Sequence, residues 1–264
     1  MTTKRNAFTL IELLVVVAII ALLMAILMPS LQRVKKQAQA VSCRSNLKQW
    51  GLIWYFYMED SDGKFNRGMY QQNAAANDWP VTLLPYYLDK GKLTLCPSAT
   101  LPQAEGGLLE RRAWNWDVQG WGNLRDKDPA LRDRGSYGQN EWLCNRDTSD
   151  NFWRELTKIK DTDNVPLFFD CAYIDAFPLH TQGAPQIKGH DVANGNEWNV
   201  VCIDRHSGYV NCVFTDFSTV RPVGLKELWL LEWHRTFDTS GPWTKAGGVI
   251  PSDWPEWMST YKDY

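Results

Sequence analysis

The sequence lacks the motifs that mark several common enzyme classes. Residues 135–138 read Gly-Ser-Tyr-Gly and miss the G-x-S-x-G nucleophile turn, and no G-x-x-x-x-G-K-[ST] phosphate loop occurs. The histidines match neither H-E-x-x-H nor another zinc-binding spacing: His180, His190, His206 and His234. We therefore expect no enzyme and no bound metal or cofactor. A pair of glycosidase carboxylates has no fixed spacing and stays open.

An excess of basic charge is also missing. The chain has 28 Lys+Arg against 30 Asp+Glu, a net charge of -2. Proteins that bind polyanions usually carry a basic surplus, so we expect no nucleic-acid partner. Internal repeats and low-complexity tracts are absent too, and 264 residues are enough for one good-sized domain plus an anchor.

Tryptophan, by contrast, is abundant. The chain contains 14 tryptophans, and most of them follow residue 50. Aromatic side chains scattered in this way usually form a core and hold short loops in place. The alternative is a carbohydrate-binding platform, which would need coplanar, exposed rings.

A long apolar run begins close to the N-terminus. It covers residues 7–28 and is interrupted only by Thr9 and Glu12, which is about the length needed to cross a hydrocarbon core of about 30 Å. The basic residues Lys4 and Arg5 precede it. By the positive-inside rule, we expect a single-pass protein of the inner (cytoplasmic) membrane with everything after about residue 30 outside the cytoplasm.

An ordinary secretory signal is the first alternative for this run. Such a signal should be followed by a small-x-small cleavage site. Residues 26–31, Ile-Leu-Met-Pro-Ser-Leu, offer a poor one, and no cysteine is present there for a lipoprotein anchor.

Glu12 is an unusual residue for such a run. An ionised side chain near the bilayer centre costs roughly 2.5–3.5 kcal/mol or more, so it needs a partner. The alternative is that Glu12 lies near the cytoplasmic interface and is simply hydrated.

The residues around Glu12 closely resemble the type IV prepilin signal. Residues 6–20 read Asn-Ala-Phe-Thr-Leu-Ile-Glu-Leu-Leu-Val-Val-Val-Ala-Ile-Ile. The resemblance implies that a prepilin peptidase cuts between Ala7 and Phe8 and methylates the new terminus, although the family usually has glycine at the place of Ala7. It also implies that Glu12 pairs with the N-terminal ammonium of a neighbouring subunit, an attraction that is strong in low dielectric.

The helix is expected to continue beyond the membrane. Pro29 ends the apolar run and removes a backbone donor, so we expect a kink or local loosening there. Residues 31–41 keep apolar positions at helical spacing among charged and polar ones. The apolar positions then move to a different face, as expected where a helix begins to pack into a domain: Leu47, Trp50, Trp54 and Tyr57.

The helix should stop in residues 59–64, which read Glu-Asp-Ser-Asp-Gly-Lys. Asp60 and Asp62 look like half of an EF-hand calcium loop, but Gln71 stands where that loop needs a bidentate glutamate. We interpret them as part of a helix stop, with calcium binding as the alternative. We expect the chain to divide into a leader peptide, a transmembrane and assembly helix, and an extracytoplasmic head: 1–7, 8–58 and 59–264.

We expect an α+β head with an antiparallel sheet. Residues 165–170 predict a buried strand, and residues 199–204 and 209–215 predict a hairpin around residues 205–208. Pairing centred near residue 207 would place Cys202 opposite Cys212, so we expect these two side chains to lie near each other.

All the cysteines follow the apolar run and would lie in an oxidising compartment. Disulfides are one interpretation, and free thiols that pack as small hydrophobic side chains are the other. The residues are Cys43, Cys96, Cys144, Cys171, Cys202 and Cys212.

The expected hairpin carries a second resemblance. Residues 205–208 leading to Asp216 are similar to the H-X9-DG element of prepilin-like proteins, with Phe217 in place of the usual glycine. We interpret His206 and Asp216 as a structural pair that fixes the turn; an acid–base pair is the alternative. Further stretches resemble the same group, and the likeness is weakest between residues 100 and 135: 43–49, 95–98, 136–138, 224–229, 233–235 and 254–258.

These resemblances imply a pilin-like protein without enzymatic activity. It would be a structural or accessory subunit of a type IV pilus or a type II secretion pseudopilus. The implied partners are prepilin peptidase, other pilin-like subunits that contact the N-terminal helix, and the membrane. The alternative is a membrane-anchored surface module that binds glycan or another substrate and uses the pilin-type signal for delivery.

Overall fold

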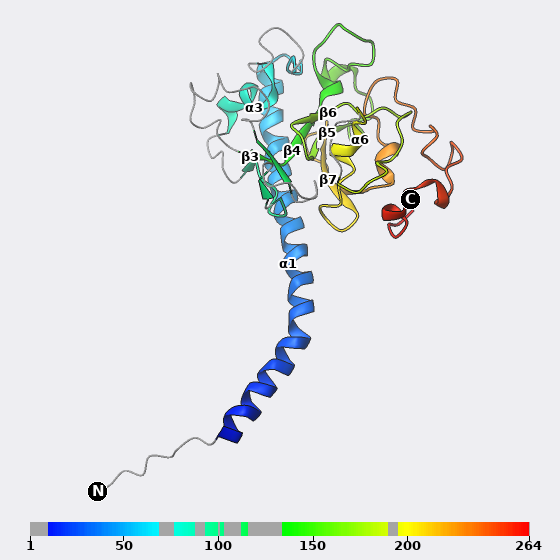
Figure 1. Ribbon diagram of the computed structural model, residues 1–264. Helices are drawn as coiled ribbons and strands as arrows, with labels where there is room; N and C mark the ends of the chain where they lie inside the picture. The colour runs from blue at the N-terminus through cyan, green and yellow to red at the C-terminus, as the bar shows by residue number, and fades with distance from the viewer. Residues whose placement is uncertain are drawn as a thin grey trace. The chain divides into compact units, whose positions relative to one another are not determined.

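The computed structural model describes residues 10–68, 77–87, 93–99, 101–102, 112–115, 134–189 and 195–263. The chain divides into two compact units, Met1–Gln39 and Ala40–Tyr264, and the long helix α1 (Leu10–Asp60) contributes to both. The other elements, shown in Figure 1, are α3 (Trp79–Thr82), η1 (Leu84–Tyr86), β1 (Leu101–Pro102), β2 (Arg112–Asn115), β3 (Arg134–Gly135), β4 (Tyr137–Asn140), η6 (Glu141–Leu143), η7 (Leu156–Lys158), β5 (Pro166–Asp170), β6 (Asp175–Ala176), α6 (Trp198–Val201), β7 (Tyr209–Phe214), β8 (Val220–Gly224), η9 (Glu227–Leu230), η10 (Pro251–Asp253) and η11 (Glu256–Met258).

In the first unit, α1 has an exposed apolar surface. Residues 10–38 are all exposed, and the N-terminal part of this helix is strongly apolar. By length and composition it is the one helix in the described ranges that could cross a membrane. The predicted long apolar helix is therefore confirmed, and it continues through Pro29.

From residue 40 onward, α1 belongs to the second unit and buries one face. The buried large side chains recur every three or four residues, as an amphipathic helix requires: Cys43, Leu47, Trp50, Trp54 and Met58. The predicted change of face is confirmed, although Tyr57 is only partly buried and Met58 completes the stripe.

The helix ends in the predicted turn. The Ser61 N–H donates to the Tyr57 carbonyl and the Gly63 N–H donates to the Met58 carbonyl, which satisfies carbonyl groups of the last turn. Gly63 has a φ of 70°, a left-handed conformation that glycine adopts without strain.

The main sheet has five strands in the order β6-β4-β5-β7-β8. The pairs β4–β5, β5–β7 and β7–β8 are antiparallel, whereas the edge strand β6 is parallel to β4. The sheet is thus mixed, with the expected antiparallel strands at its centre. A smaller sheet joins β1, β2 and β3.

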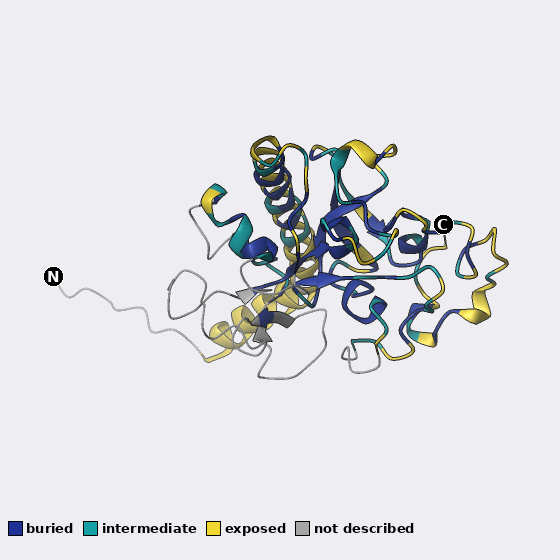
Figure 2. Ribbon diagram, turned by 90° about the horizontal axis from the view of Figure 1, so that it is seen from above, coloured by how far each residue is buried: buried dark blue, intermediate teal, exposed yellow. Residues whose placement is uncertain are grey.

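Both faces of the main sheet are covered by hydrophobic side chains. Phe168 of β5 lies against Trp50 of α1, with ring centroids 5.1 Å apart, and against Trp79, at 4.7 Å. Phe169 contacts Trp233 on the other side, at 5.0 Å. Because adjacent strand residues point to opposite faces, β5 separates two cores. Figure 2 shows the buried residues gathered in the strands and the segments beside them.

The predicted core role of tryptophan is confirmed for the residues that the structure describes. Half of the tryptophans are almost completely buried: Trp50, Trp54, Trp79, Trp114, Trp198, Trp229 and Trp233. These buried rings cannot form the exposed carbohydrate-binding platform that was the alternative interpretation of the tryptophan content.

Of the predicted hairpin of residues 199–215, the second strand is confirmed as β7 (Tyr209–Phe214), but the first strand and the pairing between the two are wrong. Trp198–Val201 forms a helical turn, α6, and the Asn196 side-chain oxygen accepts a hydrogen bond from the Trp198 N–H at 3.1 Å. A short buried apolar run does not by itself distinguish a strand from a helical turn. Cys202 follows this turn, whereas Cys212 lies on β7 and pairs with Phe169 and Arg221. The two cysteines share a core but are not on facing strands.

Candidate functional sites

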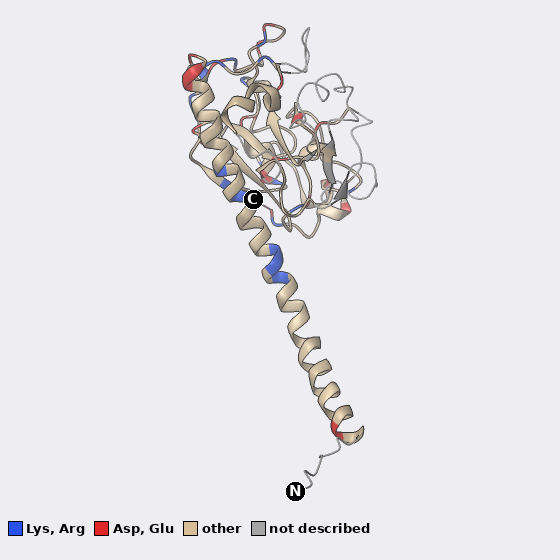
Figure 3. Cartoon of the chain, turned by 90° about the vertical axis from the view of Figure 1, so that its left-hand side faces the viewer, with Lys and Arg blue, Asp and Glu red and all other residues tan. Residues whose placement is uncertain are grey.

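The N-terminal part of α1 is the first candidate site. Glu12 is exposed in its first turn, at the end of a long stretch without charged side chains (Figure 3). Pro29 lies inside the helix and is exposed. Ala7 and Phe8, the predicted cleavage residues, lie outside the described residues. An exposed apolar helix of this kind can lie in a bilayer or against other apolar helices.

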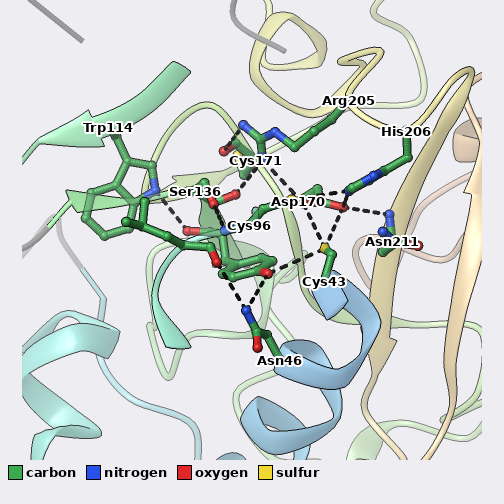
Figure 4. Close-up of polar contacts among 12 residues, drawn as sticks. Cys43, Asn46, Cys96, Trp114, Ser136, Asp170, Cys171, Arg205, His206 and Asn211 are labelled. Atoms are coloured by element: carbon green, nitrogen blue, oxygen red, sulfur yellow. Dashed lines mark hydrogen bonds and ion pairs between the residues drawn. The ribbon is translucent and has the colours of Figure 1, made fainter. Parts of the chain in front are cut away.

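A buried polar cluster is the second candidate site (Figure 4). Its four members offer sulfur, oxygen and nitrogen atoms that all lie within 4.8 Å of one another: Cys43, Cys96, Asp170 and His206. The Cys43 Sγ lies 3.3 Å from Asp170 Oδ1. The His206 Nε2 lies 3.1 Å from Asp170 Oδ2 and 3.3 Å from the Cys96 Sγ. We call these four residues the Cys–Asp–His cluster.

Four separate segments supply the cluster. Cys43 belongs to α1, and Asp170 ends β5. Cys96 is held by its backbone N–H, which donates to the Ser136 Oγ at 2.6 Å. His206 lies in the turn before β7, where the next residues have φ values of 57° and 91°; the second is Gly208, whose freedom at positive φ allows the turn.

Neighbouring groups orient the carboxylate and one thiol. The Arg205 Nη1 donates to Asp170 Oδ1 at 3.3 Å, and the Asn211 N–H donates to Asp170 Oδ2 at 3.0 Å. The Tyr137 hydroxyl donates to the Cys43 Sγ at 3.4 Å. Figure 4 shows these contacts converging on Asp170 and Cys43. Hydrogen bonds from residues outside the cluster therefore hold Asp170 and Cys43 in place.

Charge interactions within the cluster oppose the effects of burial. Burial tends to raise the pKa of Asp170, but the charge and hydrogen bond of His206 and the charge of Arg205 hold it below its usual range. Burial tends to lower the pKa of His206, but Asp170 raises it to about 9. Burial tends to raise the pKa of Cys96, yet hydrogen bonds with Cys43 and His206 lower it to about 6. Burial raises the pKa of Cys43 well above its usual value.

Thiolates, imidazole and carboxylate are all ligands of metal ions in proteins. Within the described ranges, this is the one set of three or more His, Cys, Asp or Glu side chains that gathers ligand atoms so closely. The sequence predicted no metal because the four residues are far apart along the chain and form no short spacing. The stretches that contain Cys43, Cys96 and His206 stood out in the sequence, but nothing in their spacing connected these residues with one another.

The predicted pairing of His206 with Asp216 is wrong. His206 contacts Asp170 and Cys96 instead. Asp216 accepts hydrogen bonds from the backbone N–H groups of Ser218 and Thr219, at 3.0 and 2.8 Å, and so stabilises the β7–β8 turn. His206 precedes β7 and Asp216 follows it, so the strand separates the two side chains. Each of them therefore contacts other residues.

All six cysteines are free and buried: Cys43, Cys96, Cys144, Cys171, Cys202 and Cys212. This agrees with the alternative in which they pack as small side chains rather than with the disulfide interpretation. Cys144, for example, donates from its Sγ to Glu141 Oε2 at 3.1 Å.

Asp60 and Asp62 are found in the turn that ends α1. Asp60 accepts a hydrogen bond from the Tyr86 hydroxyl at 2.8 Å, and Asp62 has a φ of 51°. Neither belongs to a metal-ligand set of three or more among the residues that the structure describes. Asp60 is the last residue of α1 and Asp62 lies in the turn that follows, which agrees with the predicted helix stop.

Residues 2–28 match the family model of the prokaryotic N-terminal methylation motif. No curated protein and no solved structure gives a significant match to the chain. The motif covers the start of α1 and is a prepilin-type signal. The chain therefore carries a signal that implies processing by prepilin peptidase and association with a membrane.

Proposed function

We propose that this chain is a structural or accessory subunit of a type IV pilus or a type II secretion pseudopilus, without enzymatic activity. Prepilin peptidase would cut between Ala7 and Phe8, and the remaining helix would hold the protein in the inner membrane with residues 59–264 outside the cytoplasm. Other pilin-like subunits would pack against the exposed apolar part of α1.

The methylation motif at residues 2–28 carries this proposal. It is supported by an exposed apolar helix that begins within the motif and continues into a folded unit with its own two cores. A cleaved secretory signal would serve only for export. A prepilin-type signal would instead lose only its leader, residues 1–7. Its apolar helix would remain with the protein and would be available for assembly.

N-terminal mass spectrometry of the protein from its native host tests the proposal. We expect a chain that begins at N-methylated Phe8 and lacks residues 1–7. The same protein from a host strain without prepilin peptidase should retain residues 1–7 and serves as the control. An intact leader in a host with an active peptidase would contradict the proposal, as would cleavage after residue 28.

A further inference from the structure

The Cys–Asp–His cluster has the composition and geometry of a metal centre. We propose that Cys43, Cys96, Asp170 and His206 together bind one Zn²⁺ ion in a structural site. This inference concerns the folded unit 40–264 and does not depend on the assembly function of the N-terminal helix.

Three of the six distances between ligand atoms can be compared with those of a tetrahedral zinc site, and all six are within 4.8 Å. Zn–S bonds of about 2.3 Å and Zn–N or Zn–O bonds of about 2.0–2.1 Å place neighbouring ligand atoms roughly 3.3–3.8 Å apart. The Cys43–Asp170 contact of 3.3 Å, the Cys96–His206 contact of 3.3 Å and the His206–Asp170 contact of 3.1 Å lie at or just below this range. Small outward shifts of these side chains would complete the coordination.

The ligand types favour Zn²⁺ over other cations. Ca²⁺ and Mg²⁺ prefer oxygen ligands, and the cluster offers only one carboxylate. Two thiolates with an imidazole and a carboxylate form a mixed sulfur, nitrogen and oxygen set that suits tetrahedral Zn²⁺. The cluster therefore matches zinc in both ligand number and ligand softness.

The formal charges also balance. With Cys43 and Cys96 as thiolates and Asp170 ionised, the ligands carry three negative charges in a buried position, because Cys43, Cys96 and Asp170 are at most 1% exposed. Such a group is costly unless cations neutralise it. Binding would release the protons that Cys43 and His206 otherwise hold, and a divalent ion together with the Arg205 guanidinium, which contacts Asp170, would then match the three negative charges.

The surroundings resemble the outer layer of a metal site. Hydrogen bonds from Arg205, Asn211 and Tyr137 hold the ligand atoms of Asp170 and Cys43, as outer partners do in zinc proteins. All four coordination positions come from the protein, which is typical of a structural rather than a catalytic ion. The ion would join α1, the Cys96 segment, β5 and the turn before β7.

A disulfide between Cys43 and Cys96 is the competing use of these sulfur atoms. It would use neither the imidazole of His206 nor the carboxylate of Asp170, although both groups are directed at the sulfur atoms. The metal site uses all four side chains, so the geometry favours it.

Metal analysis of the full-length chain in detergent micelles tests the proposal. The protein, purified with a reducing agent, should contain about one Zn²⁺ per chain. After the ion is removed and Co²⁺ is added, we expect the visible absorption of tetrahedral cobalt with thiolate ligands, and Zn²⁺ should displace it. This measurement needs no variant, so it does not depend on how well a variant folds.

Variants then assign the ligands. His206→Ala and Cys96→Ser should each weaken zinc affinity by about 100-fold or more, since even outer-layer changes cost 10–100-fold. Cys202→Ser is the matched control, because Cys202 is equally buried but belongs to the second core, whereas Cys43 and Cys96 belong to the first; this variant should retain the ion.

Three results would overturn the proposal. The first is wild-type protein that takes up neither Zn²⁺ nor Co²⁺ under reducing conditions. The second is a Cys43–Cys96 disulfide found by peptide mapping of unreduced protein from the native host. The third is an equal loss of the ion in Cys202→Ser and Cys96→Ser.

Discussion

Glu12 is the acidic side chain of the apolar part of α1, and its predicted role is electrostatic. In the proposed assembly its carboxylate would attract the methylated ammonium at Phe8 of a neighbouring subunit. We expect Glu12→Gln to leave membrane insertion and leader cleavage intact but to reduce assembly about tenfold or more, because a charge pair in low dielectric contributes more than about 1.4 kcal/mol. Immunoblots of sheared or cross-linked filaments would measure the loss.

Lys36→Gln is the control for this experiment. It removes a charge from the same helix, outside the apolar run, and should assemble normally. Normal assembly of Glu12→Gln would instead favour a Glu12 that is merely hydrated at the membrane interface.

His234 is a buried histidine with a lowered pKa. Burial is the main cause, and the charge of His180 adds to it, so that the pKa falls to about 4. The His234 ring packs against Trp142 at 5.1 Å and Phe237 at 5.1 Å. The folded state therefore holds His234 neutral at pH values where an unfolded chain would bind a proton.

Stability should accordingly fall as the pH is lowered from about 6.5 to about 4, because the unfolded state gains the proton first. We expect His234 to account for about 1–2 kcal/mol of this loss after solvent screening is allowed for. His234→Phe, which keeps an aromatic ring, should show a correspondingly smaller loss in urea unfolding at pH 7 and pH 4.5. An identical loss in the two proteins would refute this assignment.

The packing of α1 against the β7–β8 turn depends on Gly51. A Cβ atom at this position would lie 2.4 Å from the Phe217 carbonyl oxygen and 3.1 Å from a Val213 methyl group. Phe217 itself has a φ of 59°, a left-handed conformation that favours glycine. The helix and the turn thus meet through backbone atoms that cannot easily move apart.

Gly51→Ala should therefore destabilise the protein, although alanine normally stabilises a helix by about 1 kcal/mol relative to glycine. Overpacking against a backbone carbonyl costs about 1–3 kcal/mol, so after the gain in helix propensity we expect a net loss of up to about 2 kcal/mol in chemical unfolding. Leu52→Ala is the neighbouring control, since Leu52 is exposed, and should change stability much less. A more stable Gly51→Ala protein would show that the turn relaxes.

The division of the whole chain into two units predicts an independent fragment. Both hydrophobic cores are built from residues between 43 and 258, whereas the exposed apolar side chains of residues 10–34 belong to the other unit. A fragment of residues 40–264 should remain in solution without detergent and unfold cooperatively. Size-exclusion chromatography and thermal unfolding followed by circular dichroism would test this.

A fragment of residues 60–264 is the control. It lacks Trp50 and Trp54, which are completely buried, and should not give a cooperative transition, because removing such side chains costs about 3–5 kcal/mol each. Aggregation of the 40–264 fragment would show that the first unit is required for folding.

Features encoded by neighbouring residues were predictable from the sequence. The apolar run, the helical spacing of Leu47, Trp50 and Trp54, and the turn after α1 depend on residues within a few positions of one another. The match to the methylation motif at residues 2–28 is likewise a property of one short segment. Hydrophobicity, helix periodicity and turn chemistry act over such distances, so pattern alone was sufficient.

The arrangement of the head was decided by tertiary structure. Residues 198–201 form a helical turn because β5 and β8 occupy the positions beside β7, which sequence pattern does not reveal. His206 meets Asp170 and Cys96 rather than Asp216 for the same reason. The Cys–Asp–His cluster forms only when four distant segments are packed together, because contact between such residues depends on the folded chain rather than on their spacing.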